Sequence, residues 1–427
     1  MLRASFVVRR ALCPVLASLV MAVSADAQTF TYRGFLEGRG VLFPQDTPND
    51  DRNLVGDFTA RGEAFAEPAD WLMLAAGIDL RANTYGQVSD DWTPDLGDRS
   101  LERPPLSIRR LSASIYRGPL TLDAGRQFIR WGRSDILVPT DRFSPRDYLN
   151  VIDNDFLAVN AVRLRLSNGF DSLDVVWVPV FTPSRIPLLD QRWTVLPEGS
   201  LPLVLDEARD RLPERWQGGV RWERIEGGYE FAVAFFDGFS HLPVIEPALG
   251  PGGAAAGGGV APPAFIPVVR RFPGQRMYGG DGSIPTRWFT LKAEAGYFQS
   301  SDETTDDYVL YVIQMERQSG EWLFIGGYAG ESITATREGR LFAPDRGVAR
   351  SILGSASYTI DATRSLAFEG AVRQNGERVY AKAEYSQSSG QHWRTTVTGA
   401  LIAGQDGDFL GQFRRNSHLT ASLRFSF

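Results

Sequence analysis

The last ten residues of the chain alternate strictly between apolar and polar side chains. Successive side chains of a β-strand point to opposite faces, so an alternation of period two separates an apolar face from a polar face. The apolar parity ends on an aromatic residue and comprises Leu419, Ala421, Leu423, Phe425 and Phe427. The polar parity comprises His418, Thr420, Ser422, Arg424 and Ser426. The segment predicts a two-faced strand, and alternation that closes on an aromatic is typical of the final strand of bacterial outer-membrane barrels.

The first 27 residues have the composition of an export signal. Arg3, Arg9 and Arg10 precede an apolar run at Ala11–Val23, and Ala25-Asp26-Ala27 forms a small-residue cleavage motif. The apolar run is shorter than the roughly 20 residues that a spanning helix needs. We therefore expect residues 1–27 to be a signal peptide, removed near Ala27, and residues 28–427 to form one domain.

The expected mature chain contains no cysteine, because Cys13 lies in the signal. An exported protein without cysteine uses neither disulfides nor thiol chemistry. Removal of three Arg and one Asp lowers Lys+Arg from 45 to 42 and Asp+Glu from 51 to 50, a formal charge of −8. That charge argues against a nucleic-acid partner. No HExxH, GxSxG, P-loop or Cys/His metal cluster appears, so we expect no cofactor and no metal.

Long loops and short turns alternate along the rest of the chain. From Thr29 onward, alternating segments can be assigned to about 18 strands, including one near Pro267–Gly280 that follows a linker-like tract at Gly250–Gly259. Outer-membrane barrels show this asymmetry, with short periplasmic turns and long extracellular loops. The pattern predicts an all-β, transmembrane antiparallel barrel of about 18 strands, within a range of 16–18. A soluble all-β protein is the alternative, but it rarely combines so many strands with loops that are long on one side.

The polar faces of these strands carry charges of both signs. In a barrel this wide the interior is expected to be an aqueous channel, so inward charges would be hydrated. The predicted lumen residues are Arg163, Arg165, Arg221, Glu223, Lys292, Glu294, Glu369, Arg373, Lys382 and Glu384. Arg109, Arg110 and Arg126 break the parity, but we place them at outer strand ends, where a charge facing lipid costs little compared with about 2–4 kcal/mol at the midplane.

One loop is dense in arginine, aspartate and proline. Residues 130–155 could fold into the lumen and narrow it, with charges paired across the pore. The alternative is a loop that only packs the barrel mouth or stabilises its neighbours through salt bridges. The constriction candidates are Arg130, Arg133, Asp135, Asp141, Arg142, Arg146 and Asp147.

Two stretches carry a family resemblance. Gly125-Arg126-Gln127, followed by Trp131-Gly132 and by the run Asp141–Asp147, resembles a proteobacterial family of porin-like outer-membrane β-barrels of undefined function. The runs Arg271–Asp281 and Leu291–Phe298 look like a second signature of the same family. The alginate-export porins are similar more loosely, through a Gly-Arg-Gln strand before an inner loop. The resemblance implies a barrel with a transport role and supplies no catalytic residues.

These observations together predict a passive channel for small polar or amphipathic solutes in the outer membrane of a Gram-negative bacterium. We expect weak ion selectivity, because both signs of charge occur on the lumen face. The expected partners are outer-membrane lipid, the small solute and the barrel assembly machinery, which would recognise Phe427 at the periplasmic rim. A homo-oligomer is left open.

Two other classes of function are left open. Barrel lipases and proteases use histidine, and this chain has His241, His392 and His418. Ser417 and His418 with a loop aspartate could form a hydrolase site at the rim, although no spacing requires it. A structural or adhesion barrel, plugged by loops such as Thr182–Glu214 and Gly238–Pro263, is the other class. The absence of a domain before the first strand disfavours a TonB-dependent receptor.

Overall fold

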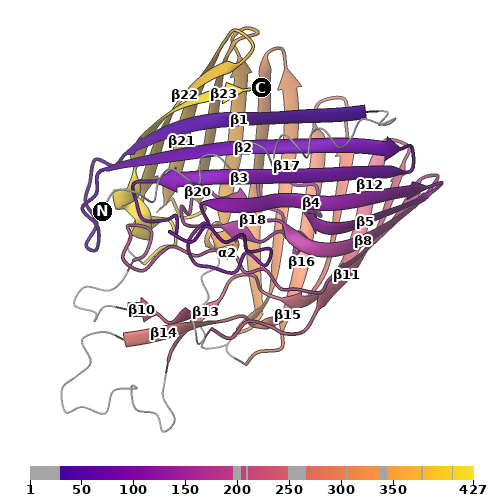
Figure 1. Ribbon diagram of the computed structural model, residues 1–427, viewed down its shortest axis with the longest axis horizontal. Helices are drawn as coiled ribbons and strands as arrows, with labels where there is room; N and C mark the ends of the chain where they lie inside the picture. The colour runs from indigo at the N-terminus through magenta and orange to yellow at the C-terminus, as the bar shows by residue number, and fades with distance from the viewer. Residues whose placement is uncertain are drawn as a thin grey trace, which may run out of the picture.

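Eighteen strands form one closed antiparallel sheet in the computed structural model (Figure 1). The structure describes residues 29–195, 203–207, 210–248, 266–303, 305–336, 344–376, 378–405 and 407–427, so the predicted signal peptide and the Gly250–Gly259 tract lie outside the described residues. The barrel strands are β1 (Thr29–Leu42), β2 (Leu54–Ala69), β3 (Leu72–Asn83), β4 (Leu106–Arg117), β5 (Leu120–Gln127), β8 (Val159–Asn168), β9 (Asp171–Val178), β11 (Gln217–Glu226), β12 (Tyr229–Phe239), β15 (Gly274–Pro285), β16 (Thr290–Ser300), β17 (Asp307–Ser319), β18 (Trp322–Ala335), β19 (Ser351–Thr359), β20 (Arg364–Arg373), β21 (Val379–Ser389), β22 (Trp393–Ala403) and β23 (His418–Ser426).

The terminal strands close the barrel. Strand β23 pairs with β1 from Phe35↔Ser426 to Leu42↔Leu419, so the alternating C-terminal segment forms the seam. Gly34 and Phe427 exchange backbone hydrogen bonds of 2.9 and 3.0 Å. A Cβ atom at Gly34 would come within 2.7 Å of the Phe427 ring, so the last aromatic side chain requires a glycine beneath it.

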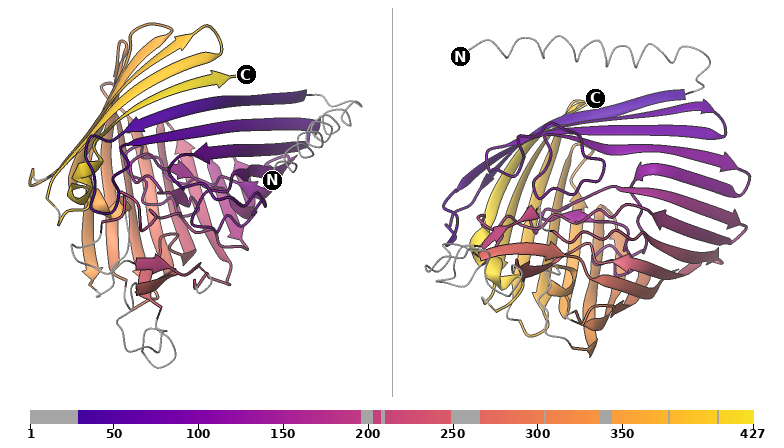
Figure 2. Two further views of the ribbon diagram at one scale, coloured as in Figure 1. Left: turned by 60° about the vertical axis from the view of Figure 1, so that its left-hand side comes forward. Right: turned by 60° about the horizontal axis from the view of Figure 1, so that its bottom comes forward.

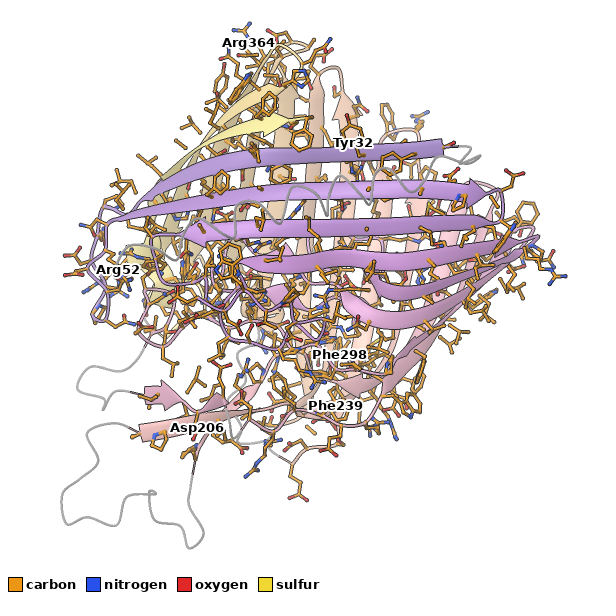
Figure 3. All side chains as sticks on the ribbon, in the orientation of Figure 1. Tyr32, Arg52, Asp206, Phe239, Phe298 and Arg364 are labelled. Carbon is orange, nitrogen blue, oxygen red and sulfur yellow. The ribbon has the colours of Figure 1, made fainter. Side chains whose placement is uncertain are left out.

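Connections differ in length at the two ends of the barrel. At one end, turns of two to four residues join the strands, and at the other end the connections run from five residues to several tens. Gly227 and Gly228 form one such turn with φ values of 63° and 87°, which favour glycine. Arg52, in a loop, and Arg364, beside a turn, mark the two rims (Figure 3). The predicted fold class and its asymmetric connections are thereby confirmed.

Smaller elements lie within the long loops. Strands β6 (Arg146–Asp147) and β7 (Asp155–Phe156) pair within one loop, while β10 (Leu203–Leu205), β13 (Val244–Pro247) and β14 (Ile266–Arg271) form a separate sheet at the loop end (Figure 1). The helical turns are α2 (Pro344–Gly347) and η3 (Gly411–Asn416). The prediction of one strand near Pro267–Gly280 is wrong. Pro273, which has no N–H to donate, separates β14 from β15. No helix among the described residues is long and apolar enough to cross a membrane.

The outer surface of the barrel is apolar. Exposed aliphatic side chains such as Val233, Ile313 and Val397 cover the middle of the strands. Aromatic side chains gather toward both rims, as in the girdles of membrane barrels. At the turn end these are Trp71, Phe170, Tyr229, Trp288, Trp393 and Phe427, and at the loop end Trp177, Trp216, Phe235 and Tyr278. The views in Figure 2 show that the strands enclose a wide interior, which loops partly occupy.

The three arginines that break parity do not face outward into the belt. Strand β4 has a β-bulge opposite Gly77 and Ile78, where the register skips Arg109. One extra residue lets both Arg109 and Arg110 point inward, where they lie over the Phe128 ring at 4.7 and 5.7 Å. Arg126 is buried and donates to the carbonyls of Ile108 and Leu96 and to Asp98. A position at a strand end is therefore not the whole reason that these charges are tolerated. The bulge turns Arg109 and Arg110 inward, and a loop covers Arg126.

A single substitution distinguishes a lipid-facing belt from a surface in water. Ile313 lies mid-way along β17 and is 51% exposed. We expect Ile313→Arg to lower the free energy of unfolding in lipid vesicles by about 2–4 kcal/mol, because lipid cannot solvate the charge. Urea titration of the vesicle-inserted protein measures the change, with Ile313→Leu as the control. An arginine variant as stable as the leucine variant would contradict a lipid-facing position.

Candidate channel lumen

The loop at residues 128–158 enters the barrel and contacts its opposite wall. Glu294, on the inner face of β16, accepts backbone N–H bonds from Arg133 (3.0 Å), Ser134 (3.2 Å) and Thr140 (2.8 Å). The Thr140 hydroxyl donates to the same carboxylate at 2.8 Å. Gly132 has a φ of 91° and a Cβ there would lie 2.6 Å from a Glu294 oxygen, so glycine permits the close approach. One buried carboxylate thus holds the tip of the loop.

Neighbouring strands hold the same limb of the loop. Gln314 of β17 accepts from the backbone N–H groups of Asp135 and Ile136 at 2.9 and 3.3 Å. Lys292 of β16 pairs with Asp135 at 2.7 Å. The Arg133 guanidinium pairs with three acidic side chains of the wall, which are Glu223 of β11, Glu230 of β12 and Asp281 of β15.

The returning limb is held on the other side of the barrel. Asp153 lies 3.3 Å from Lys382 of β21 and 3.9 Å from Arg39 of β1. Asp155 receives three guanidinium groups, from Arg109 at 3.3 Å, Arg61 at 3.4 Å and Arg81 at 3.7 Å. The loop therefore spans the interior from β16 and β17 to β1–β4.

Behind the loop the interior is a packed apolar core. Trp131 and Phe143 meet edge to face at 4.9 Å, and Phe143 meets Phe236 of β12 at 5.1 Å. The wall contributes further buried side chains, which include Val159, Val176, Met277, Phe298 and Leu310. The expectation of an aqueous interior is wrong for this side of the barrel. Inward apolar residues near the loop ends of β8–β18 pack against the loop instead of facing water.

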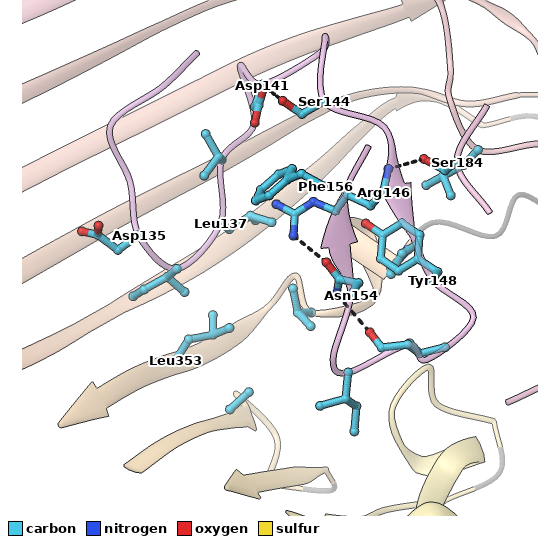
Figure 4. Close-up of a pocket in the computed structure, with 18 of the residues that line it drawn as sticks. Asp135, Leu137, Asp141, Ser144, Arg146, Tyr148, Asn154, Phe156, Ser184 and Leu353 are labelled. Carbon is cyan, nitrogen blue, oxygen red and sulfur yellow. Dashed lines mark hydrogen bonds between the residues drawn. The ribbon is translucent and has the colours of Figure 1, made fainter. Parts of the chain in front are cut away.

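Between the loop and the facing strands lies a cavity of about 520 Å³ (Figure 4). On the wall side it is lined by Leu353 and Ser355 of β19, Glu369 and Ala371 of β20, and Tyr380 of β21. On the loop side the guanidinium groups of Arg130 and Arg146 each lie 4.2 Å from the Phe156 ring centre. Arg146 also donates to Asn154 at 2.8 Å, as Figure 4 shows. The lining combines aliphatic, aromatic and charged surfaces.

A buried ion cluster ties the loop to two others. Asp147 accepts from Arg103 at 2.7 Å and from Arg185 at 3.2 Å, and Arg185 also pairs with Asp98. Burial alone would raise the pKa of Asp147, but Arg103 and Arg185 outweigh it and hold that pKa well below its usual value. Asp141 differs, because burial raises its pKa despite a hydrogen bond from Ser144.

The predicted lumen residues find partners on the inner face. Arg163 binds Asp174 (2.5 Å), Arg165 binds Asp123 (3.0 Å), Arg221 binds Asp281 (2.8 Å), Lys382 binds Asp153, Arg373 binds Asp408, Glu369 accepts from Tyr380 (2.6 Å), Glu384 accepts from Ser386 (3.2 Å), and Glu223, Lys292 and Glu294 hold the loop. The expectation that these charges are hydrated is wrong for Arg221 and Glu294, which are buried. A pore-lining role for the others stays a prediction.

The predicted constriction residues divide into anchors and cavity-facing groups. Arg133, Asp135 and Asp147 are anchors, as described above, and Asp141 is buried. Arg130, whose side chain is 54% exposed, and Arg146 face the cavity, and Arg142 lies over the Phe298 ring at 4.9 Å.

Several residues of the site were missed in the sequence. Arg61, Asp79 and Arg81 lie on the inward parity of β2 and β3, and their alternation could have been read like that of the other strands. Asp79 binds Arg61 at 2.7 Å and Arg81 at 3.0 Å. Asp153 and Asp155 carried no such signal, because a loop has no periodicity.

The histidines do not form the imagined hydrolase site. Ser417 Oγ accepts from the backbone N–H of Ile402 at 3.0 Å, whereas His418 Nδ1 lies 2.8 Å from the Asn416 carbonyl. The His418 ring is buried against Phe43. His241 is partly buried and its ring nitrogens lie between two loop carbonyls, and desolvation lowers its pKa to about 4. No cluster of three or more potential ligands for a metal occurs in the described part of the chain.

Comparison with solved structures places this architecture among porins. A BenF-like porin from Pseudomonas fluorescens Pf-5 superposes with a TM-score of 0.54 at 9% identity, covering 94% of this chain and 99% of that one. OccAB4 of Acinetobacter baumannii gives a TM-score of 0.53 at 8% identity, covering 94% and 98%. No protein-family model matches the chain, and no curated protein matches its sequence significantly. At these identities the likeness shows the fold: the chain has the architecture of these porin structures.

The Glu294 anchor gives a direct test of the loop's attachment. We expect Glu294→Ala to free the tip of the loop, because three backbone N–H groups lose their acceptor at a cost of about 1–3 kcal/mol each. Trypsin should then cut the folded protein at Arg130, Arg133 or Arg142, as read by mass spectrometry. Glu384→Ala is the matched control, since Glu384 faces inward but binds Ser386 rather than the loop. Equal protection of both variants would contradict the anchoring role.

The lowered pKa of Asp147 predicts loosening in acid. A carboxyl group whose folded pKa lies below its ordinary value of 3.8 stabilises the fold above that pH and loses the contribution as pH falls further. We expect protease protection of residues 84–105 and 179–195 to fall between pH 4 and pH 2, with pepsin as the protease. Asp147→Asn should be less protected already at pH 4. Asp361→Asn, at an exposed turn, should behave like the unmodified protein, and the same acid response in Asp147→Asn and the parent would contradict this assignment.

Proposed function

We propose that the chain is a channel in the outer membrane of a Gram-negative bacterium, reached after signal-peptide cleavage near Ala27. The observation that carries the proposal is a cavity of about 520 Å³ inside a closed barrel whose outer belt is apolar. The porin structures with the same fold support it. The resemblance of the Gly125–Gly132 and Asp141–Asp147 motifs to a porin-like family of undefined function, and more loosely to alginate-export porins, is part of this proposal.

The solutes that fit are small and polar or amphipathic. The cavity offers aliphatic surface at Leu353 and Ala371, an aromatic face at Phe156, and charges of both signs at Arg130 and Glu369. Most inward charges that approach the cavity are already paired, so their fields cancel at short range. We infer weak ion selectivity and a passage that discriminates chiefly by size and shape, with the loop at 128–158 as the constriction.

Partners follow from the same proposal. Lipid would cover the apolar belt, and the assembly machinery would recognise Phe427, which is 50% exposed at the turn rim. Association of several copies is a prediction that the single chain leaves open.

A plugged structural barrel is the second candidate. The core between the loop and β8–β18 favours it, because that part of the interior has no room for solute. Conductance separates the two functions: a plugged barrel carries no current in a planar bilayer.

A pair of adjacent residues tests the channel. Ser355 faces the cavity, whereas Ala356, next along β19, pairs with Phe324 and Phe368 on the outer face. We expect Ser355→Trp to reduce single-channel conductance at least about twofold, because an indole fills a large part of a passage this small. Ala356→Trp should leave the current unchanged. This substitution tests the passage more selectively than deletion of Ser134–Tyr148, because the deletion would also expose the core behind the loop. No current from the unmodified protein, or equal currents from both variants, would overturn the proposal.

A further inference from the structure

Charges on the outer face of the barrel are confined to its rims. Among the described barrel strands, charges on the outward parity lie near strand ends, and those at the turn rim include Arg117, Arg224, Arg317 and Arg364. At the loop rim, Arg126 is buried beneath a loop. Asp237 of β12 and Arg276 of β15 are the charged, outward residues there within the described strands, and they pair across the ladder.

A second arginine joins this pair. Arg215, just before β11, lies 2.6 Å from one oxygen of Asp237, while Arg276 lies 3.4 Å from the other. The arginine side chains are 47% and 56% exposed, whereas Asp237 is 26% exposed. One carboxylate between two guanidinium groups leaves a net positive charge, and each guanidinium has five N–H donors, more than Asp237 can use.

Directly below the arginines the surface is apolar. Phe235 and Tyr278 lie 5.2 Å apart on the outer face, and Trp216 is half exposed beside Arg215. On the loop side of Asp237, Phe239, labelled in Figure 3, lies 5.2 Å from the Arg215 guanidinium. Farther toward the middle of the belt, β15 and β16 present small residues in register, Gly280 opposite Ala295 and Gly282 opposite Ala293. Exposed Val233 and Ile313 flank this strip of small residues on the neighbouring strands.

We propose that Arg215 and Arg276 bind a phosphate of a phosphorylated, multiply acylated glycolipid of the outer leaflet, with an acyl chain along the strip of small residues. The inference rests on the proposed function, which places the loop rim in the outer leaflet. Guanidinium groups bind phosphate through paired, charge-assisted hydrogen bonds, and the apolar strip continues in the direction that acyl chains take from a headgroup. Asp237 holds the two arginines apart and oriented, so the phosphate finds them preorganised.

Binding of defined lipids to the full chain in an uncharged detergent tests the proposal. The probes are diphosphoryl lipid A, its dephosphorylated form and inorganic phosphate, each titrated and read by native mass spectrometry. We expect lipid A to bind, and the Arg215→Gln/Arg276→Gln double variant to bind it about tenfold or more weakly, as expected for lost charge-assisted bonds. Dephosphorylated lipid should bind as weakly to the unmodified protein as lipid A binds to the double variant.

Two matched controls locate the site. Arg350 is exposed beside the first residue of β19 at the same rim, and Arg317 is exposed at the turn rim. Arg350→Gln and Arg317→Gln should each keep the affinity for lipid A. An equal loss in either control, no loss in the double variant, or inorganic phosphate that binds as tightly as the lipid would overturn the proposal.

Conductance of the same variants keeps this inference separate from the proposed function. The double variant should conduct like the unmodified protein, because both arginines lie outside the barrel wall. A protein that binds lipid A through this site but carries no current would support the lipid site and contradict the proposed channel. A protein that conducts but does not bind lipid A would support the channel and contradict the lipid site.

Discussion

The pairing of β1 with β23 is the interaction on which the rest of the structure depends. A sheet surrounded by apolar solvent cannot leave edge strands open, because each unpaired backbone group would be costly. Closure through eighteen strands removes both edges, and it also encloses an interior too wide for the inward side chains to fill. Every feature of the lumen is a response to that enclosed space.

The loop at residues 128–158 fills one side of this space by folding as an internal core. A segment with so little regular structure must still satisfy its backbone N–H groups. Here Glu294 and Gln314 accept several of them, so side chains of the wall replace the ladder that the loop lacks. The apolar side chains of the loop then cover Phe236 and Phe298, which would otherwise face water. Anchoring and packing reinforce each other, because the anchors hold the loop where its apolar side chains cover those of the barrel wall.

The barrel could be predicted from the sequence because its signal is local. Alternation within each segment was enough to predict the strands, the turns and the outward apolar belt. The last ten residues indicated the strand that closes the barrel. The fold of the loop could not be predicted in the same way. Thr140 and its acceptor Glu294 are 154 residues apart, and no pattern near either one indicates the other. The bulge that turns Arg109 inward is likewise set by pairing with Gly77 and Ile78 rather than by β4 alone.

One part of the core did leave a signal in the sequence. Val309–Ile313 in β17 is an uninterrupted apolar run, and so is Phe231–Phe236 in β12. Such runs indicate strands that are apolar on both faces. In a barrel whose outer face already meets lipid, an apolar inner face requires a second covering layer from the protein itself. The places where alternation fails therefore indicate which strands an inserted loop must cover, whereas β20 and β21, which alternate cleanly, line the cavity.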